Sequence, residues 1–292
     1  TSDNSTSDNS STGSSNIGPQ KVYIVGSAVT EKCIYYDCPK SKVVIWDLGG
    51  NMTVLDDSCG PADATSHNDS IYIAGDTQYC VVGPDKKVVS HELNVPSGYV
   101  ENSQESTGIA VSSNGDVYVS GKATKNKKSV AAYWKNGELI KSFSEKSDWD
   151  SEKNVAVDSN GNVYIPGWKM KNHNVIHASY WKNGVLKNLT STFDGEATDV
   201  DVSGTNIYFS GAHGPICDLP CPVTNGILAA YWQVGKGMTK VTKVKTAHVP
   251  RKFVMRSRAS SIHIDGSTVY MAGEVDGYIP VYWKNKTQYE LE

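Results

Sequence analysis

Short hydrophobic strands that end in glycine recur along the chain and predict its architecture. Each strand starts with valine or isoleucine, has tyrosine at its second position and ends in glycine. Six copies occur, at residues 22–26, 71–75, 117–121, 163–167, 207–211 and 269–273. Their glycines are 49, 46, 46, 44 and 62 residues apart. A period in the forties that contains only strand signals is typical of β-propeller blades.

The fourth repeat shows how one period makes one blade. Residues 154–157, 162–165, 177–181 and 185–190 read as four strands. Asn160-Gly161 and Asn183-Gly184 fall between them, and both residue types tolerate the positive φ of a tight hairpin turn. We therefore predict an all-β fold, a six-bladed β-propeller of four-stranded antiparallel blades, over residues 20–290. In the first repeat we expect residues 16–18 to supply the innermost strand.

An aromatic third strand repeats as clearly as the second. The pairs are Tyr133-Trp134, Tyr180-Trp181, Tyr231-Trp232 and Tyr282-Trp283, with Ile45-Trp46 a more distant copy. One interpretation is an exposed stripe that stacks on sugars. The other is packing between blades, which we favour because five of the six repeats place tryptophan at the same point.

These two motifs together suggest a relationship. A "VYxxG" strand followed by an "AxYWKNG" hairpin resembles a group of repeat propellers found in secreted and envelope proteins, many of them bacterial and without assigned function. The resemblance covers nearly all of residues 20–290. It implies the fold but little about function, because propellers include binding modules, scaffolds, hydrolases and lyases.

Composition excludes some classes of function. The 292 residues carry a net charge of −3, which argues against nucleic acid as a partner, and no apolar run approaches the roughly 20 residues of a transmembrane span. Residues 1–19 form a Ser/Asp/Asn-rich segment that we expect to be a disordered linker. It resembles the spacer after the lipid-modified cysteine of bacterial lipoproteins, so a lipid tether upstream of residue 1 is one interpretation and a plain flexible linker the other. Residues 291–292 read as a cloning scar.

The six cysteines suggest disulfides in an exported protein. They are Cys33, Cys38, Cys59, Cys80, Cys217 and Cys221. We favour two short loops, 33/38 and 217/221, and a 59/80 bridge between neighbouring blades, although six cysteines allow fifteen pairings. Zinc is the competing explanation, but neither short pair has the usual two-residue spacing. We expect no metal ion and no cofactor, and a monomer at the cell surface or outside the cell, with a bacterial envelope favoured over eukaryotic secretion.

Alignment of the first strands places polar residues around one mouth of the central tunnel. At the rim it gives Glu105, Ser151, Glu196 and Arg258, and slightly further in Glu152, Asn154, Asp199 and Ser260, with Asp201 and His263 deeper. The long connections 27–42, 168–176, 212–226 and 240–258 are expected on this same face. Polar groups around one mouth can orient a polar ligand, although they can also simply solvate the opening.

The candidate site residues follow from this alignment. For ligand binding they are Arg258, Arg256, Asn154, Asp199, His263 and Trp168. For acid–base catalysis the candidates are Glu105, Glu152 and Glu196. Residues 240–258 contain seven lysines and arginines and no acidic residue, which would attract carboxylate, sulfate or phosphate groups unless they form only a solvated loop. Asp158-Ser159-Asn160-Gly161-Asn162 faintly resembles a calcium loop, but we expect a hairpin turn there.

Three functions remain open from sequence. The first is a binding or scaffold propeller whose ligand, an anionic glycan or a protein, lies over the tunnel mouth on the long-loop face. The second is a glycan-active hydrolase or lyase that uses the rim carboxylates. The third is a structural envelope protein without a ligand. The absence of a nucleophile elbow, a phosphate-binding loop and a zinc-protease motif favours the first.

Overall fold

In a computed structural model, the protein folds into β-strands joined by turns. The structure describes residues 23–28, 42–47, 51–55, 59–60, 62–102, 104–143, 154–172, 175–190, 195–214, 227–241, 257–275 and 279–291. No helix in these residues is long and apolar enough to cross a membrane.

The strands form six antiparallel sheets in chain order. The first three sheets comprise β1 (Tyr23–Ala28), β2 (Lys42–Asp47) and β3 (Met52–Val54); β4 (Asp63–His67), β5 (Ser70–Gly75), β6 (Gln78–Val82) and β7 (Val88–Glu92); and β8 (Glu105–Val111), β9 (Val117–Lys125), β10 (Lys128–Lys135) and β11 (Glu138–Ser142). The last three comprise β12 (Ala156–Val157), β13 (Val163–Asn172), β14 (Val175–Lys182) and β15 (Val185–Asn188); β16 (Gly195–Ser203), β17 (Asn206–His213), β18 (Leu228–Gln233) and β19 (Gly237–Lys240); and β20 (Ser257–Asp265), β21 (Thr268–Val275), β22 (Ile279–Lys284) and β23 (Thr287–Glu290).

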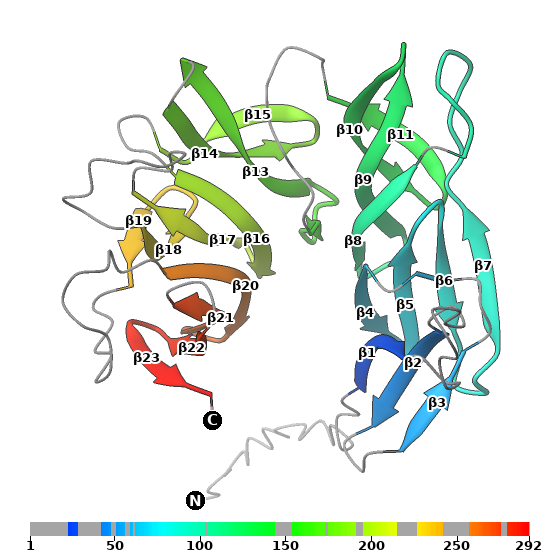
Figure 1. Ribbon diagram of the computed structural model, residues 1–292, viewed down its shortest axis with the longest axis horizontal. Coiled ribbons are helices and arrows are strands. Elements are labelled where there is room, and N and C mark those ends of the chain that lie inside the picture. The colour runs from blue at the N-terminus through cyan, green and yellow to red at the C-terminus, as the bar shows by residue number, and fades with distance from the viewer. Residues whose placement is uncertain are drawn as a thin grey trace, which may run out of the picture.

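Each sheet is one blade of a propeller. Figure 1 shows the sheets arranged around a common centre, with β8 and β16 close to it and β7 and β19 at the periphery. The all-β, six-bladed prediction is confirmed. Five blades have four strands; the first has three within the described residues, and the innermost strand expected at 16–18 lies outside them.

The hydrophobic core is divided into layers between neighbouring blades. Five clusters of buried residues join blades one and two, two and three, three and four, four and five, and five and six. Trp134, Trp181, Trp232 and Trp283 each lie in one of the last four clusters and are at most 4% exposed. Packing between blades is therefore confirmed over sugar stacking for these four, whereas Trp46 is half-buried.

The recurring glycine is required by a β-bulge in the first strand. The pairing of the first two strands shifts register within the third, fifth and sixth blades, directly opposite the glycine. The bulge pushes a first-strand carbonyl against the second strand. A Cβ at Gly121, Gly211 or Gly273 would overlap that oxygen, so only glycine fits.

The Lys-Asn-Gly hairpin ties the third strand back to the second. Asn183 has a φ of 50° and Gly184 a φ of 77°. The side-chain oxygen of Asn183 accepts the N–H of Val163 at 2.8 Å, and the ammonium of Lys182 lies 5.4 Å from the centre of the Tyr164 ring. Asn136 and Asn285 make the same bond in the third and sixth blades, so the "VYxxG" and "YWKN" motifs contact each other directly.

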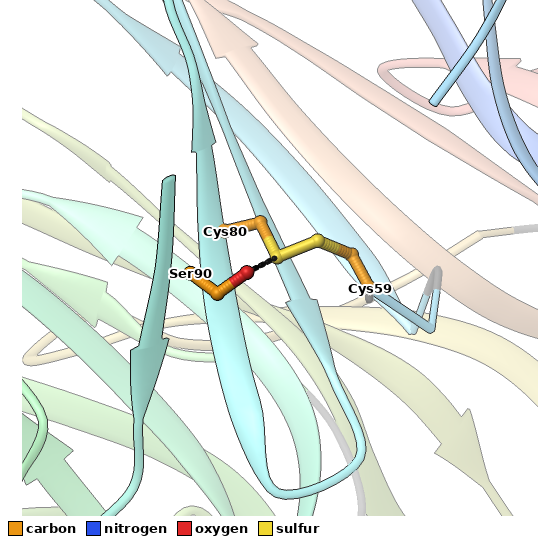
Figure 2. Close-up of a disulfide and its surroundings, with 3 residues drawn as sticks. All are labelled: Cys59, Cys80 and Ser90. Atoms are coloured by element: carbon orange, nitrogen blue, oxygen red, sulfur yellow. Dashed lines mark hydrogen bonds between the residues drawn. A yellow bond between two sulfur atoms is a disulfide. The ribbon is translucent and has the colours of Figure 1, made fainter. Parts of the chain in front are cut away.

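One disulfide lies within the described residues. Cys59, in the connection that enters the second blade, is bonded to Cys80 on β6, and the Sγ of Cys80 lies 3.5 Å from the Ser90 hydroxyl on β7 (Figure 2). This pairing was predicted, and both residues belong to the cluster between the first two blades. Cys33, Cys38, Cys217 and Cys221 lie outside the described residues, so their pairing stays a prediction.

Candidate functional site

The first strands of five blades surround a central cavity. It has a volume of about 260 Å³ and is lined by residues of β4, β8, β16 and β20 and by residues 154–157. Its ionisable lining residues are Asp63, Asp201 and His263. The cavity lies where the central tunnel was predicted. We use the word rim for the aligned residues at its mouth, Glu105, Glu196 and Arg258.

Strand pairing confirms that three of the aligned rim residues are equivalent. Glu105, Glu196 and Arg258 each pair with the residue that follows the recurring glycine of their own blade. Each also precedes the bulge, at the start of its blade's first strand. The fourth aligned residue, Ser151, lies outside the described residues.

The rim arginine is paired with a rim carboxylate. Nε of Arg258 on β20 lies 2.6 Å from Oε1 of Glu196 on β16, so the contact bridges the fifth and sixth blades. The side chain of Arg258 is 40% exposed and that of Glu196 only 17%. The Nε–H bond of Arg258 does not point at this oxygen, so the contact is an ion pair and does not have hydrogen-bond geometry. The side chain of Arg258 therefore remains partly exposed to solvent beside this contact.

Asp199 lies at a junction of three blades. Its Oδ2 accepts the N–H of Ile262 in the sixth blade at 2.8 Å. Its Oδ1 accepts the N–H of Val200 at 2.8 Å and the side-chain N–H of Asn154, from the fourth blade, at 2.6 Å. Burial raises the pKa of Asp199 to about 7, although the three donors lower it; the charge of Asp63 adds to the increase.

Two further aspartates repeat this arrangement. Oδ2 of Asp63 accepts the N–H of Ile109 in the next blade at 2.9 Å, and burial raises the pKa of Asp63. Oδ1 of Asp201 accepts the N–H of Val202 at 2.7 Å, and its Oδ2 accepts the N–H of Ile264, also at 2.7 Å. We call this arrangement a carboxylate clamp, because one carboxylate caps inner-edge N–H groups of its own blade and of the next.

The clamps change the interpretation of two predicted ligand residues. Asp199 and Asn154 come together as predicted, but their polar atoms bond mainly to each other and to the backbone. His263 is exposed, with Nδ1 at 3.2 Å from Oδ2 of Asp201. Asp63 was missed by the sequence alignment, which began with the third repeat. The signal was an Asp followed by an apolar residue before the second strand of the repeat, as at Asp199.

The remaining candidates are more scattered. Glu105 is exposed and pairs in register with Lys122 of its own blade. Trp168 is half-buried on β13, opposite Ala178 of β14. Glu152 and Arg256 lie outside the described residues, as does most of the basic segment 240–258.

The calcium-like sequence forms a hairpin turn, as expected. Both oxygens of Asp158 are engaged within the turn and its strand, accepting the N–H groups of Asn160 and Asn162 at 2.9 Å and the Tyr164 hydroxyl at 3.0 Å. Burial and this bond to Asp158 raise the pKa of Tyr164 to about 12. Within the part of the chain that the structure describes, no three His, Cys, Asp or Glu residues are grouped to hold a metal ion.

Comparison with known proteins adds no function. No protein-family model and no curated protein matches the chain. Among solved structures, a streptogramin B lyase has 12% identity and a TM-score of 0.47, with 86% of this chain and 76% of that chain covered. Selenomethionine-substituted virginiamycin B lyase from Staphylococcus aureus has 12% identity and a TM-score of 0.47, with 93% and 88% covered. The N-terminal domain of Nup159 has 9% identity and a TM-score of 0.36, with 85% and 70% covered.

Proposed function

We propose that the chain is a non-catalytic binding propeller whose ligand lies over the cavity mouth, on the face where the inter-blade connections arrive. The observation that carries this proposal is the engagement of the central carboxylates. Asp63, Asp199 and Asp201 each bond to the backbone of the next blade, and Glu196 is paired with Arg258. Carboxylates held in this way link neighbouring blades, and their oxygens are poorly placed to exchange protons with a substrate.

An anionic glycan is the ligand that the rim charges favour. The side chain of Arg258 remains 40% exposed, and the segment 240–257 before it carries six lysines and arginines and no acidic residue. Sulfate and carboxylate groups of a polysaccharide would pair with such donors. The central cavity of about 260 Å³ is open in the described residues, which argues against a plugged, purely structural ring. The disulfide supports a place outside the cytoplasm.

Catalysis is the second candidate, because Asp199 has a pKa raised to about 7. A carboxyl group with such a pKa suits acid–base chemistry near neutral pH. Against this function, Asp199 is only 4% exposed and its two oxygens accept three hydrogen bonds from protein groups. A substrate could reach it only by breaking the junction of three blades.

The test is retention on a panel of neutral and anionic polysaccharides, with released fragments measured in the same samples. We expect retention on sulfated or uronate polysaccharides without new reducing or unsaturated ends. The Arg258→Gln variant should show much weaker retention on these polysaccharides. Glu196→Gln should keep or increase retention, because it leaves the Arg258 charge uncompensated. Lys187→Gln, an exposed cation on outer strand β15, is the matched control and should bind normally. Released fragments, or equal retention by Arg258→Gln, would overturn the proposal.

A further inference from the structure

One carboxylate clamp is missing at a position where its two partners are present. In the fifth blade Asp201 pairs with Tyr208, the next residue Val202 pairs with Ile207, and the clamp reaches Ile264 of the sixth blade. The third blade has the same register: Ala110 pairs with Tyr118, and Val111 pairs with Val117. Ala110 therefore occupies the position of Asp201 without a carboxylate.

The two N–H groups that a clamp would cap point into the cavity. Val117 exchanges both backbone bonds on the side of β10, since its N–H donates to the side chain of Asn136 and its C=O accepts the Asn136 N–H. Val111, directly opposite Val117, therefore lies in a non-bonded pair and directs its N–H to the other edge, toward the cavity.

The fourth blade repeats this geometry. Val163 exchanges its backbone bonds with Asn183, so Val157, opposite it, also directs its N–H into the cavity. Among the described residues we find no acceptor for the N–H of Val111 or of Val157. By the register, these two groups correspond to the N–H groups of Val202 and Ile264, which Asp201 caps. Two unpaired donors next to a small side chain leave space for a carboxylate from outside the chain.

The cavity also restricts what that carboxylate can be attached to. Two aspartates, Asp63 and Asp201, line the same cavity against one histidine, His263, so a plain anion would be repelled, whereas a ligand that also carries a positive group would be attracted. A volume of about 260 Å³ admits only a small molecule. We propose that the cavity binds a small zwitterion of amino-acid type, with its carboxylate on the N–H groups of Val111 and Val157 and its ammonium facing Asp63 and Asp201. This site is distinct from the rim, and the inference does not depend on glycan binding there.

The first test restores the missing clamp and needs no ligand. Ala110→Asp would place a carboxylate between the third and fourth blades, and we expect the melting temperature to rise by several degrees. Ala156→Asp is the matched control: it is the equivalent position of the fourth blade, but its second partner, the N–H of Val202, is already capped by Asp201. That variant should melt at or below the parent temperature. A fall in melting temperature for Ala110→Asp would overturn the assignment of the two N–H groups.

The second test measures binding by calorimetry to the parent protein and to Ala110→Asp. The probes are glycine, β-alanine and 4-aminobutyrate as zwitterions of increasing length, with propionate and ethylamine as single-charge controls. We expect at least one zwitterion to bind ten-fold or more tightly than either control and to lose binding in Ala110→Asp. If no zwitterion binds, or if binding survives in a correctly folded Ala110→Asp, the proposal is wrong. Polysaccharide retention should be unchanged in this variant, which separates the cavity from the rim.

Discussion

The carboxylate of Asp199 accepts the backbone N–H of Ile262 at 2.8 Å, so that a side chain of the fifth blade completes the inner edge of the sixth. Inner strands of a propeller have one edge without a partner strand, and its N–H groups need acceptors. Asp63 and Asp201 supply acceptors in the same way. The polar lining of the cavity is thus part of what holds neighbouring blades together.

The first prediction concerns pH. Burial raises the pKa of Asp199 from 3.8 to about 7, so the folded state binds a proton that the unfolded state has already released between these values. Stability is therefore greatest at the acid end of this window and falls as the pH rises from about 4 to about 7. The full shift corresponds to at most about 4 kcal/mol. Urea unfolding at pH 4.5, 6 and 7.5 would measure the slope.

The matched variant for this prediction is Asp199→Asn. It loses one acceptor and should be less stable throughout, but its unfolding free energy should depend less on pH, because Asp63 alone remains as a nearby buried acid with a raised pKa. If Asp199→Asn kept the parent slope, Asp199 would not be the titrating group.

The second prediction concerns the bulge. Gly211→Ala places a Cβ against the carbonyl oxygen of Glu196, and we expect a loss of about 3 kcal/mol in unfolding free energy. Gly204→Ala is the control, because its Cβ would meet nothing within 4 Å and only its φ of 60° is unfavourable for alanine. That change should cost about 1 kcal/mol. Equal losses at the two sites would mean that the bulge carbonyl can move away.

The third prediction concerns the turn asparagine. Asn183→Ala removes the acceptor for the Val163 N–H and the exposed donor to Oδ1 of Asn162, and it also puts alanine at a φ of 50°. We expect a loss of about 2 kcal/mol in thermal or chemical unfolding. Asn126→Ala tests the backbone effect alone, since Asn126 has the same φ of 50° and, within the described residues, no side-chain hydrogen bond. The difference between the two variants should be about 1 kcal/mol; no difference would remove the bond to Val163 as a cause.

The fourth prediction concerns the disulfide. Replacing Cys59 and Cys80 together by serine opens a link between residues 21 positions apart and should cost about 3 kcal/mol. Because the two residues are only 2% and 0% exposed, the bond in the folded protein should resist mild reductant. Peptide mapping without reduction should recover the Cys59–Cys80 cross-link. Alkylation of either thiol in unfolded, unreduced protein would contradict the pairing.

Much of the fold was predictable because its determinants are local. The hairpin Asn183-Gly184 and the buried Trp181 act within one repeat, and each recurs at a fixed spacing. Strand length was less predictable: β13 and β14 extend to Asn172 and start at Val175, beyond the predicted 162–165 and 177–181. The extension depends on cross-strand pairing, which the alternating pattern alone does not limit.

The site was predictable only as a set of positions. Alignment correctly made Glu196 and Arg258 equivalent, but it could not show that they bond to each other across two blades. The alignment placed Asp199 near a ligand, whereas in the structure its carboxylate accepts the backbone N–H of Ile262. A contact between residues 63 positions apart in the chain leaves no periodic trace in a single sequence. The missing carboxylate at Ala110 could not be predicted for the same reason, because it is recognised only by comparing the register of Ala110 with that of Asp201.

The bulge described for the third, fifth and sixth blades also bears on how such a chain can change over generations. The carbonyl at the start of the first strand is acceptable only where the second strand ends in glycine, so a change that adds a side chain there must be accompanied by a change in the first strand. A shift of one residue between them would set the carbonyl against a side chain. The heritable unit is therefore the stretch that contains both, and an exchange of segments between repeats is tolerated only when its boundaries fall outside that stretch.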